Sequence, residues 1–159
     1  NSKKELRKKL REFRNAQFIL LDSKREELSE LAVKTNAIDG TTYQARYPMV
    51  KKMAKRNIAQ IINFNELLSV EEDRIPGLLS LFQRSAKYCK KYKIPLMIVS
   101  GAKEKMDCRG ASDLIGFGEF LGLSKKEAKE ALGKHQKKLV ERIKLKSAGK
   151  WIRPGVVIE

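Results

Sequence analysis

Apolar positions along the chain follow two patterns that alternate from the first residues onward. Stretches with apolar residues three and four positions apart predict amphipathic helices at 2–13, 23–32, 45–54, 70–92, 112–121 and 124–143. Short apolar runs predict strands at 17–22, 37–42, 58–63 and 96–100, with a last extended segment at 151–158. Because these runs do not alternate with polar residues, we expect buried parallel strands covered by helices on both faces.

The order of the predicted elements indicates the α/β class. Helices that alternate with parallel strands form either an open doubly wound sheet or a (β/α) barrel. Four to five strands are too few to close a barrel of eight. We therefore expect either an open sheet or a barrel-like fold whose amino-terminal β/α units are missing from this chain. A length of 159 residues fits one domain, and we expect a single α/β domain over 1–159.

Local signals predict several helix starts and one core position. Ser2, Ser23 and Ser124 are each followed by a glutamate three residues later, which predicts three capping boxes. Ser112 is expected to cap the helix that begins beside it, with an aspartate in its first turn. Cys89 continues the helical spacing of the longest predicted helix, so we expect it in the core rather than at a reactive site.

The charge of the chain narrows its function class. There are 35 Lys and Arg residues against 19 Asp and Glu, a formal net charge of +16 at pH 7. This excess favours nucleic acid as a partner, because each neutralised phosphate releases condensed counterions. A solvated basic surface without a partner is the alternative. The longest apolar runs are far shorter than the about 20 residues of a membrane span, and the first residues are polar. We therefore expect no secretory signal and an intracellular protein.

Few residues support catalytic or ligand-binding chemistry. His135 is the single histidine and is expected as an exposed helix residue, which argues against a histidine-based metal centre. Gly116 and Gly118 lie inside a helical pattern and do not form a phosphate-binding glycine loop. They are expected to allow close packing of helices instead.

Three carboxylates leave one metal-dependent alternative open. Asp22, Asp39 and Glu66 lie at the ends of predicted strands, where a (β/α) fold places its functional groups. Side chains of this type can hold two magnesium ions for phosphoester chemistry. They also cap the helices that follow strands, and the sequence leaves both interpretations open.

The segment 95–123 is the most distinctive part of the sequence. An apolar strand leads to Ser100-Gly101-Ala102, and a charged loop then ends in Asp107-Cys108-Arg109 before an Asp-Leu helix. Upstream, a basic helix end is followed by the pattern Ile61-x-Asn63-Phe64-x-x-Leu67-Leu68. The order and spacing of these motifs resemble the ribonuclease P protein component 3 family, the archaeal and eukaryotic protein-30 subunit, over about residues 15–145.

The resemblance implies a fold and a function. The family folds as a TIM-barrel-related barrel, similar to polymerase/histidinol phosphatase-like enzymes but without their histidine ligands, and its first β/α units are not seen here. The resemblance implies a non-catalytic RNA-binding subunit of ribonuclease P that supports the catalytic RNA in removing 5′ leaders from precursor tRNA. Its expected partners are that RNA, precursor tRNA within the complex, protein component 2 and other ribonuclease P proteins. No cofactor is expected on the protein, because magnesium acts on the RNA. The expected location is the cytoplasm, or the nucleus or nucleolus of a eukaryote.

Basic side chains are the candidate RNA-binding residues. Arg109 is the strongest candidate, because a guanidinium in a loop after a strand can hold one phosphate with two hydrogen bonds; a salt bridge to Asp107 or Asp113 is the alternative. The other candidates are Lys55, Arg56, Lys90, Lys91, Lys103 and Lys105.

Aromatic residues and two further function classes remain as alternatives. Tyr43, Tyr47, Tyr88 and Tyr92 could stack on unpaired bases, and for Tyr88 and Tyr92 packing between helices is the favoured alternative. The chain could also be a metal-dependent phosphoesterase of the same fold, or a general basic scaffold associated with ribosomal or other RNA.

Overall fold

The computed structural model describes residues 2–157 except 14–15, 17, 149–150 and 154–155. Its α-helices are α1 (Ser2–Glu12), α2 (Glu26–Thr35), α3 (Tyr47–Arg56), α4 (Asn65–Leu68), α5 (Ile75–Tyr92), α6 (Ala111–Phe120), α7 (Lys125–Lys129) and α8 (His135–Ser147). Its strands are β1 (Leu20–Leu21), β2 (Gly40–Thr41), β3 (Ala59–Asn63), β4 (Leu96–Val99), β5 (Trp151–Arg153) and β6 (Val156–Val157). Between them lie two 3₁₀ turns, η1 (Glu72–Arg74) and η2 (Lys105–Asp107), and a π-helical turn, η3 (Glu130–Lys134).

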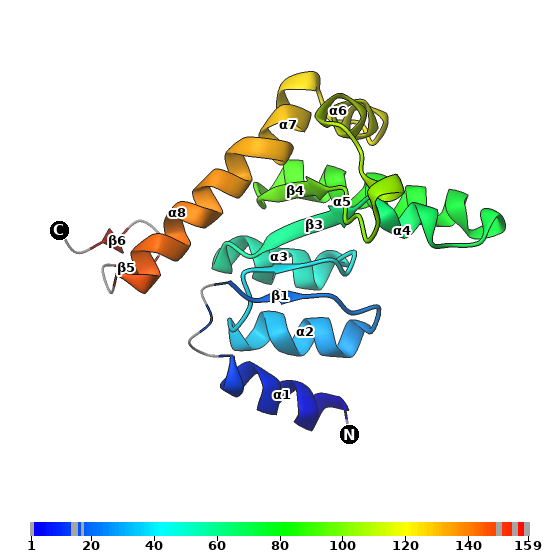
Figure 1. The fold of residues 1–159 in the computed structure, drawn as a ribbon. Helices are drawn as coiled ribbons and strands as arrows, with labels where there is room; N and C mark the ends of the chain where they lie inside the picture. Colours follow the sequence, from blue (N-terminus) through cyan, green and yellow to red (C-terminus); the bar gives the residue numbers. More distant parts are fainter. Residues whose placement is uncertain (1, 14–15, 17, 149–150, 154–155, 158–159) are drawn as a thin grey trace.

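One sheet positions the other elements. It contains β1, β2, β3 and β4 in that order, all parallel. In Figure 1, α3 and α5 lie behind the strands, α1 and α2 lie beyond β1, and α6, α7 and α8 lie beyond β4. The predicted order of elements and their parallel pairing are confirmed. The extended segment expected at the carboxyl end is the separate antiparallel pair β5–β6, and its Pro154-Gly155 turn lies outside the described residues.

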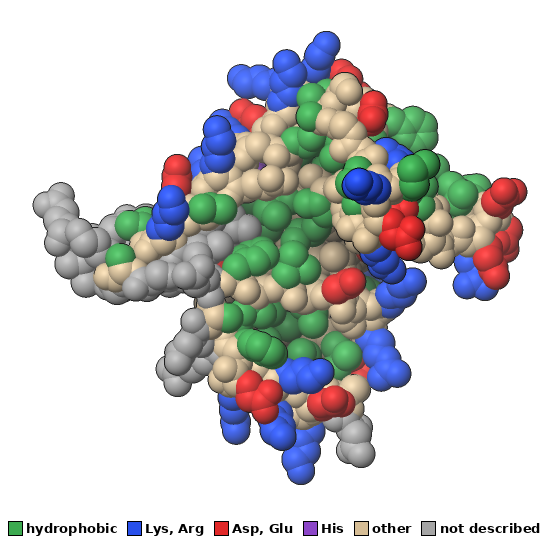
Figure 2. Space-filling model, viewed as in Figure 1, with side chains coloured by type: hydrophobic (Ala, Val, Ile, Leu, Met, Phe, Trp, Pro, Cys, Tyr) green, Lys and Arg blue, Asp and Glu red, His purple; other side chains and the backbone are tan. Residues whose placement is uncertain are grey.

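The core lies between the sheet and the helices behind it. Phe82 of α5 and Ile62 of β3 are fully buried there, and each such side chain stabilises the fold by about 1.5–3 kcal/mol. On the other face of the sheet, Ala59, Ile61 and Met97 form a second buried cluster. Figure 2 shows hydrophobic side chains over the middle of the molecule and Lys and Arg around its outline. None of the helices in the described residues is long and apolar enough to cross a membrane.

A buried amide connects β3 to the loop that follows β2. Gln60 is 2% exposed, and its Nε2 donates to the carbonyl oxygens of Thr41 at 3.3 Å and Tyr43 at 3.1 Å. Its Oε1 accepts from the backbone N–H of Ala45 at 3.5 Å. The polar side chain inside an apolar strand therefore fixes the course of residues 41–45, because buried backbone groups need partners.

Side chains from the beginning of α8 cover the outer edge of β4. The carbonyls of Pro95 and Val99 face β3, where they accept from backbone N–H groups, so those of Leu96 and Ile98 face away from the sheet. His135 Nδ1 lies 2.8 Å from the Leu96 oxygen, and Gln136 Nε2 donates to the Ile98 oxygen at 3.5 Å. The expectation that His135 is an exposed helix residue is wrong, because the ring is half-buried against the edge of this strand.

Of the four predicted helix caps, one is confirmed and two are wrong, and the cap expected at Ser2 stays a prediction because the residue before it lies outside the described residues. Ser124 and Glu127 form the expected capping box at the start of α7. Ser23 instead accepts from the backbone N–H of Arg25, so α2 begins three residues later, at Glu26. A short hydroxyl can bond the backbone two residues ahead, which competes with capping.

The helix in the distinctive segment begins earlier than Ser112. Its start is at Ala111, and the Asp113 carboxylate accepts from the backbone N–H of Gly110 at 3.2 Å. The N-cap is therefore Gly110, and the serine lies inside the first turn. Glycine is an acceptable N-cap because the aspartate three residues on satisfies its N–H.

Close packing of α6 on α7 depends on Gly118. A Cβ atom there would lie 2.8 Å from the Cβ of Ala128 and 3.1 Å from Cδ1 of Ile98. At Gly116 a Cβ meets nothing within 4 Å, so the expectation of close packing holds for Gly118 and is wrong for Gly116.

We expect Gly118→Ala to lower the free energy of unfolding by about 1–3 kcal/mol, because the helices must separate to admit the methyl group. Gly116→Ala is the matched control on the same helix. It is expected to raise stability by about 0.5–1 kcal/mol through lower backbone entropy of the unfolded chain. Urea unfolding of both variants measures the difference, and equal midpoints would contradict the packing argument.

Candidate nucleic-acid interface

The loop after β4 is held in one conformation by its own backbone and side chains. Gly101 has φ +59°, in the left-handed region, and turns the chain away from the sheet. The Asp107 carboxylate then accepts from the backbone N–H groups of Lys103 at 3.2 Å and Glu104 at 3.4 Å. These contacts cap the η2 turn, which the backbone hydrogen bond from Cys108 N–H to the Lys105 oxygen at 3.2 Å closes.

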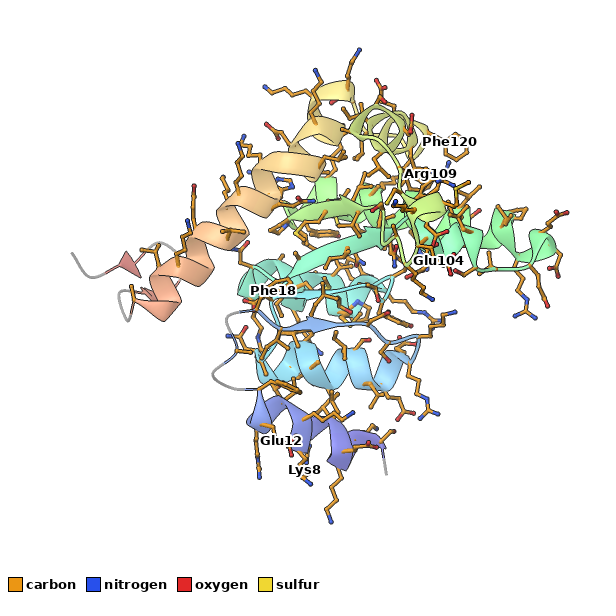
Figure 3. The ribbon with its side chains drawn as sticks, viewed as in Figure 1. Lys8, Glu12, Phe18, Glu104, Arg109 and Phe120 are labelled. Carbon is orange, nitrogen blue, oxygen red and sulfur yellow. The ribbon has the colours of Figure 1, made fainter. Side chains whose placement is uncertain are left out.

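Arg109 lies at the end of this loop, where Figure 3 shows it between Phe120 and Glu104. Its Nη1 donates to the carbonyl oxygens of Met106 at 2.8 Å and Cys108 at 3.0 Å. The guanidinium lies over the ring of Phe64, 5.5 Å from its centre. These contacts orient the side chain and leave Nε and Nη2 as donors for a phosphate.

The alternative role for Arg109 is not what the structure shows. Within the described residues it forms no salt bridge with Asp107 or Asp113. Both carboxylates bind backbone N–H groups of the loop instead. Lys103 and Lys105 are exposed on the same loop and have no ion-pair partner in the part of the chain that is described. The loop therefore presents three cations at the carboxyl edge of the sheet.

The three carboxylates weighed as a magnesium site do not come together. Asp39 lies before β2, at the amino edge of the sheet, and accepts from the backbone N–H of Ile19 at 3.1 Å. Asp22 and Glu66 lie at the opposite edge, where Asp22 accepts from the Thr42 hydroxyl at 2.6 Å. Burial, and then repulsion from Asp22, raises the pKa of the Glu66 carboxyl. Among the described residues, no group of three His, Cys, Asp or Glu side chains is placed to hold a metal.

Two of the other predicted RNA-binding residues already bind another group of this chain, and a third does not. Arg56 donates to the carbonyl oxygen of Val33, at the end of α2, and so joins α3 to α2. Lys90 pairs with Glu127 at 3.0 Å, across 37 residues of sequence. Lys55 is exposed and, in the described structure, has no ion-pair partner. RNA contact by each of them stays a prediction.

The Glu127 carboxylate that holds Lys90 is itself strongly stabilised. The backbone N–H of Ser124, then the Lys90 ammonium and the Ser124 side chain, lower the pKa of Glu127 to about 2. This carboxylate is therefore charged throughout the physiological range, and Lys90 is bound to it. Lys90 thus differs from Lys103 and Lys105, which have no ion pair among the described residues, although an exposed pair of this kind contributes only about 0–1 kcal/mol.

Three tyrosines and two lysines meet where α3 packs on α5. The Tyr92 ring makes edge contacts with Tyr47, at 5.9 Å between ring centres, and a tilted contact with Tyr88 at 6.4 Å. Lys51 lies over Tyr47 at 4.9 Å and Lys91 over Tyr92 at 5.6 Å. These rings pack between helices, and Tyr47 keeps 46% of its surface exposed.

Tyr43 lies apart from the other three tyrosines, in the loop after β2, and is half-buried. Burial, then the charge of Glu26, raises its pKa, so the phenol stays neutral.

Comparison with known proteins decides the family. The family model described as RNase P subunit p30 matches residues 1–148. The chain belongs to the RNase P subunit p30 family. Ribonuclease P protein component 3 of Methanosarcina mazei is 27% identical to this p30-family chain over 110 residues, which is 69% of this chain and 45% of the relative. The Thermococcus kodakarensis protein of the same name is 26% identical over 87 residues, which is 55% of this chain and 40% of the relative.

The p30-family chain spans less than half the length of these relatives. Its fold also matches one chain in the cryo-EM structure of an archaeal ribonuclease P with mature tRNA, with a TM-score of 0.85 and 22% identity. The match covers all of this chain and 72% of that one. The fold is therefore a TIM-barrel-related α/β fold, as expected, of which the four parallel strands are a part.

The sequence analysis did not identify three polar residues of this p30-family chain whose role depends on the tertiary structure. Gln60, His135 and Gln136 satisfy backbone groups far from them in sequence. The signal for Gln60 was an amide within an apolar run, which marks a buried polar network. The helical pattern of 124–143 gives no such signal for the other two, since it does not show which strand lies at the edge.

Proposed function

We propose that this chain acts as part of a non-catalytic RNA-binding subunit of ribonuclease P. In this proposal the catalytic RNA removes 5′ leaders from precursor tRNA, and magnesium acts on the RNA. The partners would be that RNA, precursor tRNA within the complex, and other ribonuclease P proteins, including protein component 2. Membership of the p30 family is the observation that carries the proposal.

Charge and geometry support the same function. The net charge of +16 favours a polyanion as the partner, and Arg109, Lys103 and Lys105 lie together on one loop. Cations on a rigid loop would contact phosphates and hold RNA helices in place without reading bases.

The test is recovery of the tagged protein from native extract at moderate salt, followed by sequencing of the RNA and an assay of precursor-tRNA leader removal. We expect enrichment of one structured RNA and leader removal that is lost after nuclease digestion of that RNA. Leader removal by the RNA-free protein with magnesium or manganese would instead establish a phosphoesterase. A broad mixture of ribosomal and transfer RNA, without leader removal, would establish a general basic scaffold.

A further inference from the structure

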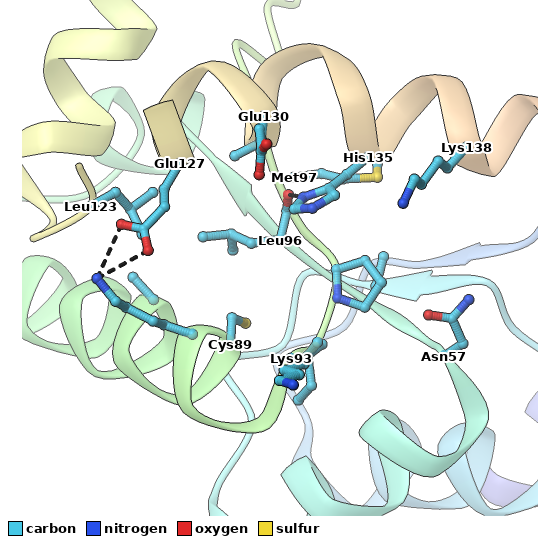
Figure 4. A pocket seen from close by; sticks show the side chains of 16 residues that line it. Asn57, Cys89, Lys93, Leu96, Met97, Leu123, Glu127, Glu130, His135 and Lys138 are labelled. Atoms are coloured by element: carbon cyan, nitrogen blue, oxygen red, sulfur yellow. Dashed lines mark hydrogen bonds and ion pairs between the residues drawn. The ribbon is translucent and has the colours of Figure 1, made fainter. Parts of the chain in front are cut away.

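A cavity of about 420 Å³ opens at the amino edge of the sheet, on the opposite side from the loop of Arg109. It lies between the end of α5, the beginnings of β3 and β4, and the η3–α8 segment (Figure 4). Cys89, Leu96 and Leu123 form part of an apolar floor, and all three are buried. The volume falls in the range of about 300–1,000 Å³ that is usual for small-molecule sites.

The charges around this cavity leave a positive rim. Both acidic residues of the lining are already paired, Glu127 with Lys90 at 3.0 Å and Glu130 with Lys134 at 2.8 Å. Lys93 and Lys138 also line the cavity, and within the described residues neither has an ion-pair partner. An apolar floor under two unpaired ammonium groups fits a ligand with an apolar body and an anionic group.

His135 adds a polar group to the wall. Its Nδ1 lies 2.8 Å from the Leu96 carbonyl oxygen, which can only accept, so the proton is assigned to Nδ1. In the tautomer with its proton on Nδ1, Nε2 is an acceptor on a side chain that lines the cavity. The cavity therefore offers cations for an anion and an acceptor for an N–H or O–H of the same ligand.

The backbone at Lys93 is a second, independent observation. Lys93 ends α5 in the left-handed region, at φ +55°, and its N–H bonds the carbonyl oxygen of Cys89. Asn36 and Asn57 occupy the same position after α2 and α3, at φ 54° and 53°. Asparagine and glycine tolerate this conformation and lysine does not favour it. The sequence thus places an ammonium group at the cavity where another residue would suit the helix end better.

We propose that this cavity binds a nucleotide, with the base and ribose on the apolar floor and the phosphate between Lys93 and Lys138. The choice of a nucleotide rests on the proposed RNA-binding function. The nucleotide comes either from the bound RNA, as a residue turned out of its helix, or from free nucleoside monophosphate in solution. Both have the same chemistry, and the experiment distinguishes them.

The decisive variant is Lys93→Gly, which removes the ammonium and supplies the residue that the helix end prefers. We expect its urea midpoint to equal or exceed that of the wild type, while its affinity for nucleotide falls about tenfold or more. Asn36→Gly is the control for the backbone change alone, because it places glycine at the same left-handed position at the end of α2, removes no charge and lies away from the cavity. It is expected to leave nucleotide affinity unchanged.

Calorimetric titration of the full chain uses AMP, UMP and inorganic phosphate as probes, and a second series measures affinity for ribonuclease P RNA. Weaker binding of AMP and of the RNA to Lys93→Gly, with mutual competition, would assign the cavity to a nucleotide of the RNA. Weaker AMP binding with unchanged RNA binding would assign it to a free nucleotide. If AMP does not bind and the RNA does, a tenfold loss of RNA affinity in Lys93→Gly still assigns the cavity to the RNA.

Two results would overturn the proposal. In one, phosphate binds as tightly as AMP, which would make the site a plain anion site that does not use its apolar floor. In the other, neither Lys93→Gly nor Lys138→Gln changes the affinity for any probe or for the RNA. The latter result, with leader removal intact, would reject the cavity and leave the ribonuclease P function standing. If AMP binding depends on Lys93 but the protein recovers no ribonuclease P RNA, the cavity is confirmed as a nucleotide site and the ribonuclease P function is rejected.

Discussion

Replacement of Gly101 by alanine is expected to lower the free energy of unfolding by about 2–5 kcal/mol and to displace the loop that carries Arg109. An alanine at φ +59° costs about 1–2 kcal/mol in backbone strain. Its Cβ would also lie 1.8 Å from Oδ1 of Asn63, so the asparagine must move. That oxygen accepts from the backbone N–H of Asn65 at 3.0 Å, and loss of the bond costs about 1–3 kcal/mol more.

Two further variants separate these causes. Gly122→Ala also has a positive φ, at +91°, but its Cβ meets nothing within 4 Å, so it measures strain alone. The double variant Gly101→Ala/Asn63→Gly removes the collision and is expected to be less destabilised than the sum of its single changes. Urea unfolding measures each midpoint. Strict additivity of the two substitutions would show that the contact with Asn63 is not what requires glycine.

Arg109→Met is expected to weaken binding of ribonuclease P RNA by about 10- to 100-fold, because one charge-assisted contact contributes about 1.5–3 kcal/mol. Methionine keeps an apolar chain near Phe64, and the carbonyl oxygens that Arg109 binds belong to exposed or half-exposed loop residues that water can reach. We therefore expect stability to fall by about 1 kcal/mol or less. Arg109→Lys is expected to be intermediate, since an ammonium cannot bind a phosphate in the bidentate way.

The measurement is RNA affinity against salt concentration, alongside urea unfolding. Loss of one phosphate contact should reduce the slope of log affinity against log salt by about one. Arg74→Met removes the same charge from an exposed pair with Glu71 at 3.3 Å and controls for net charge. If Arg109→Met unfolds at much lower urea while its folded fraction binds RNA normally, the guanidinium serves the loop and not the RNA.

Features of the fold that depend on residues close together in the chain could mostly be predicted from the sequence. The alternation of helices and strands, the burial of Cys89 and the capping box at Ser124 depend on residues within a few positions of one another. The predictions for Ser23 and Ser112 were wrong although they are local. The Ser23 hydroxyl accepts from the backbone N–H of Arg25, and the Ser112 hydroxyl donates to the carboxylate of Asp113, so each serine bonds a neighbour and does not cap its helix.

The sequence predicted which residue types make up the candidate site, but not which of its side chains form ion pairs. The sequence indicated a basic protein with a charged loop after the fourth strand, and the structure has both. It could not show that Lys90 is held by Glu127 while Lys103 and Lys105 have no ion pair with any residue that the structure describes. Ion pairs between residues 37 positions apart depend on how helices pack, which charge patterns along the chain do not determine.

By itself the sequence determined the α/β class, the order of the elements and the excess of positive charge, because these depend on local periodicity and composition. The tertiary structure alone decided which edge of the sheet each polar group occupies. It separated Asp39 from Asp22 and Glu66, and it placed His135 on the open edge of β4. Parallel strands bring together residues from distant segments at each edge, so only the folded chain brings Lys93 and Lys138 to the rim of one cavity.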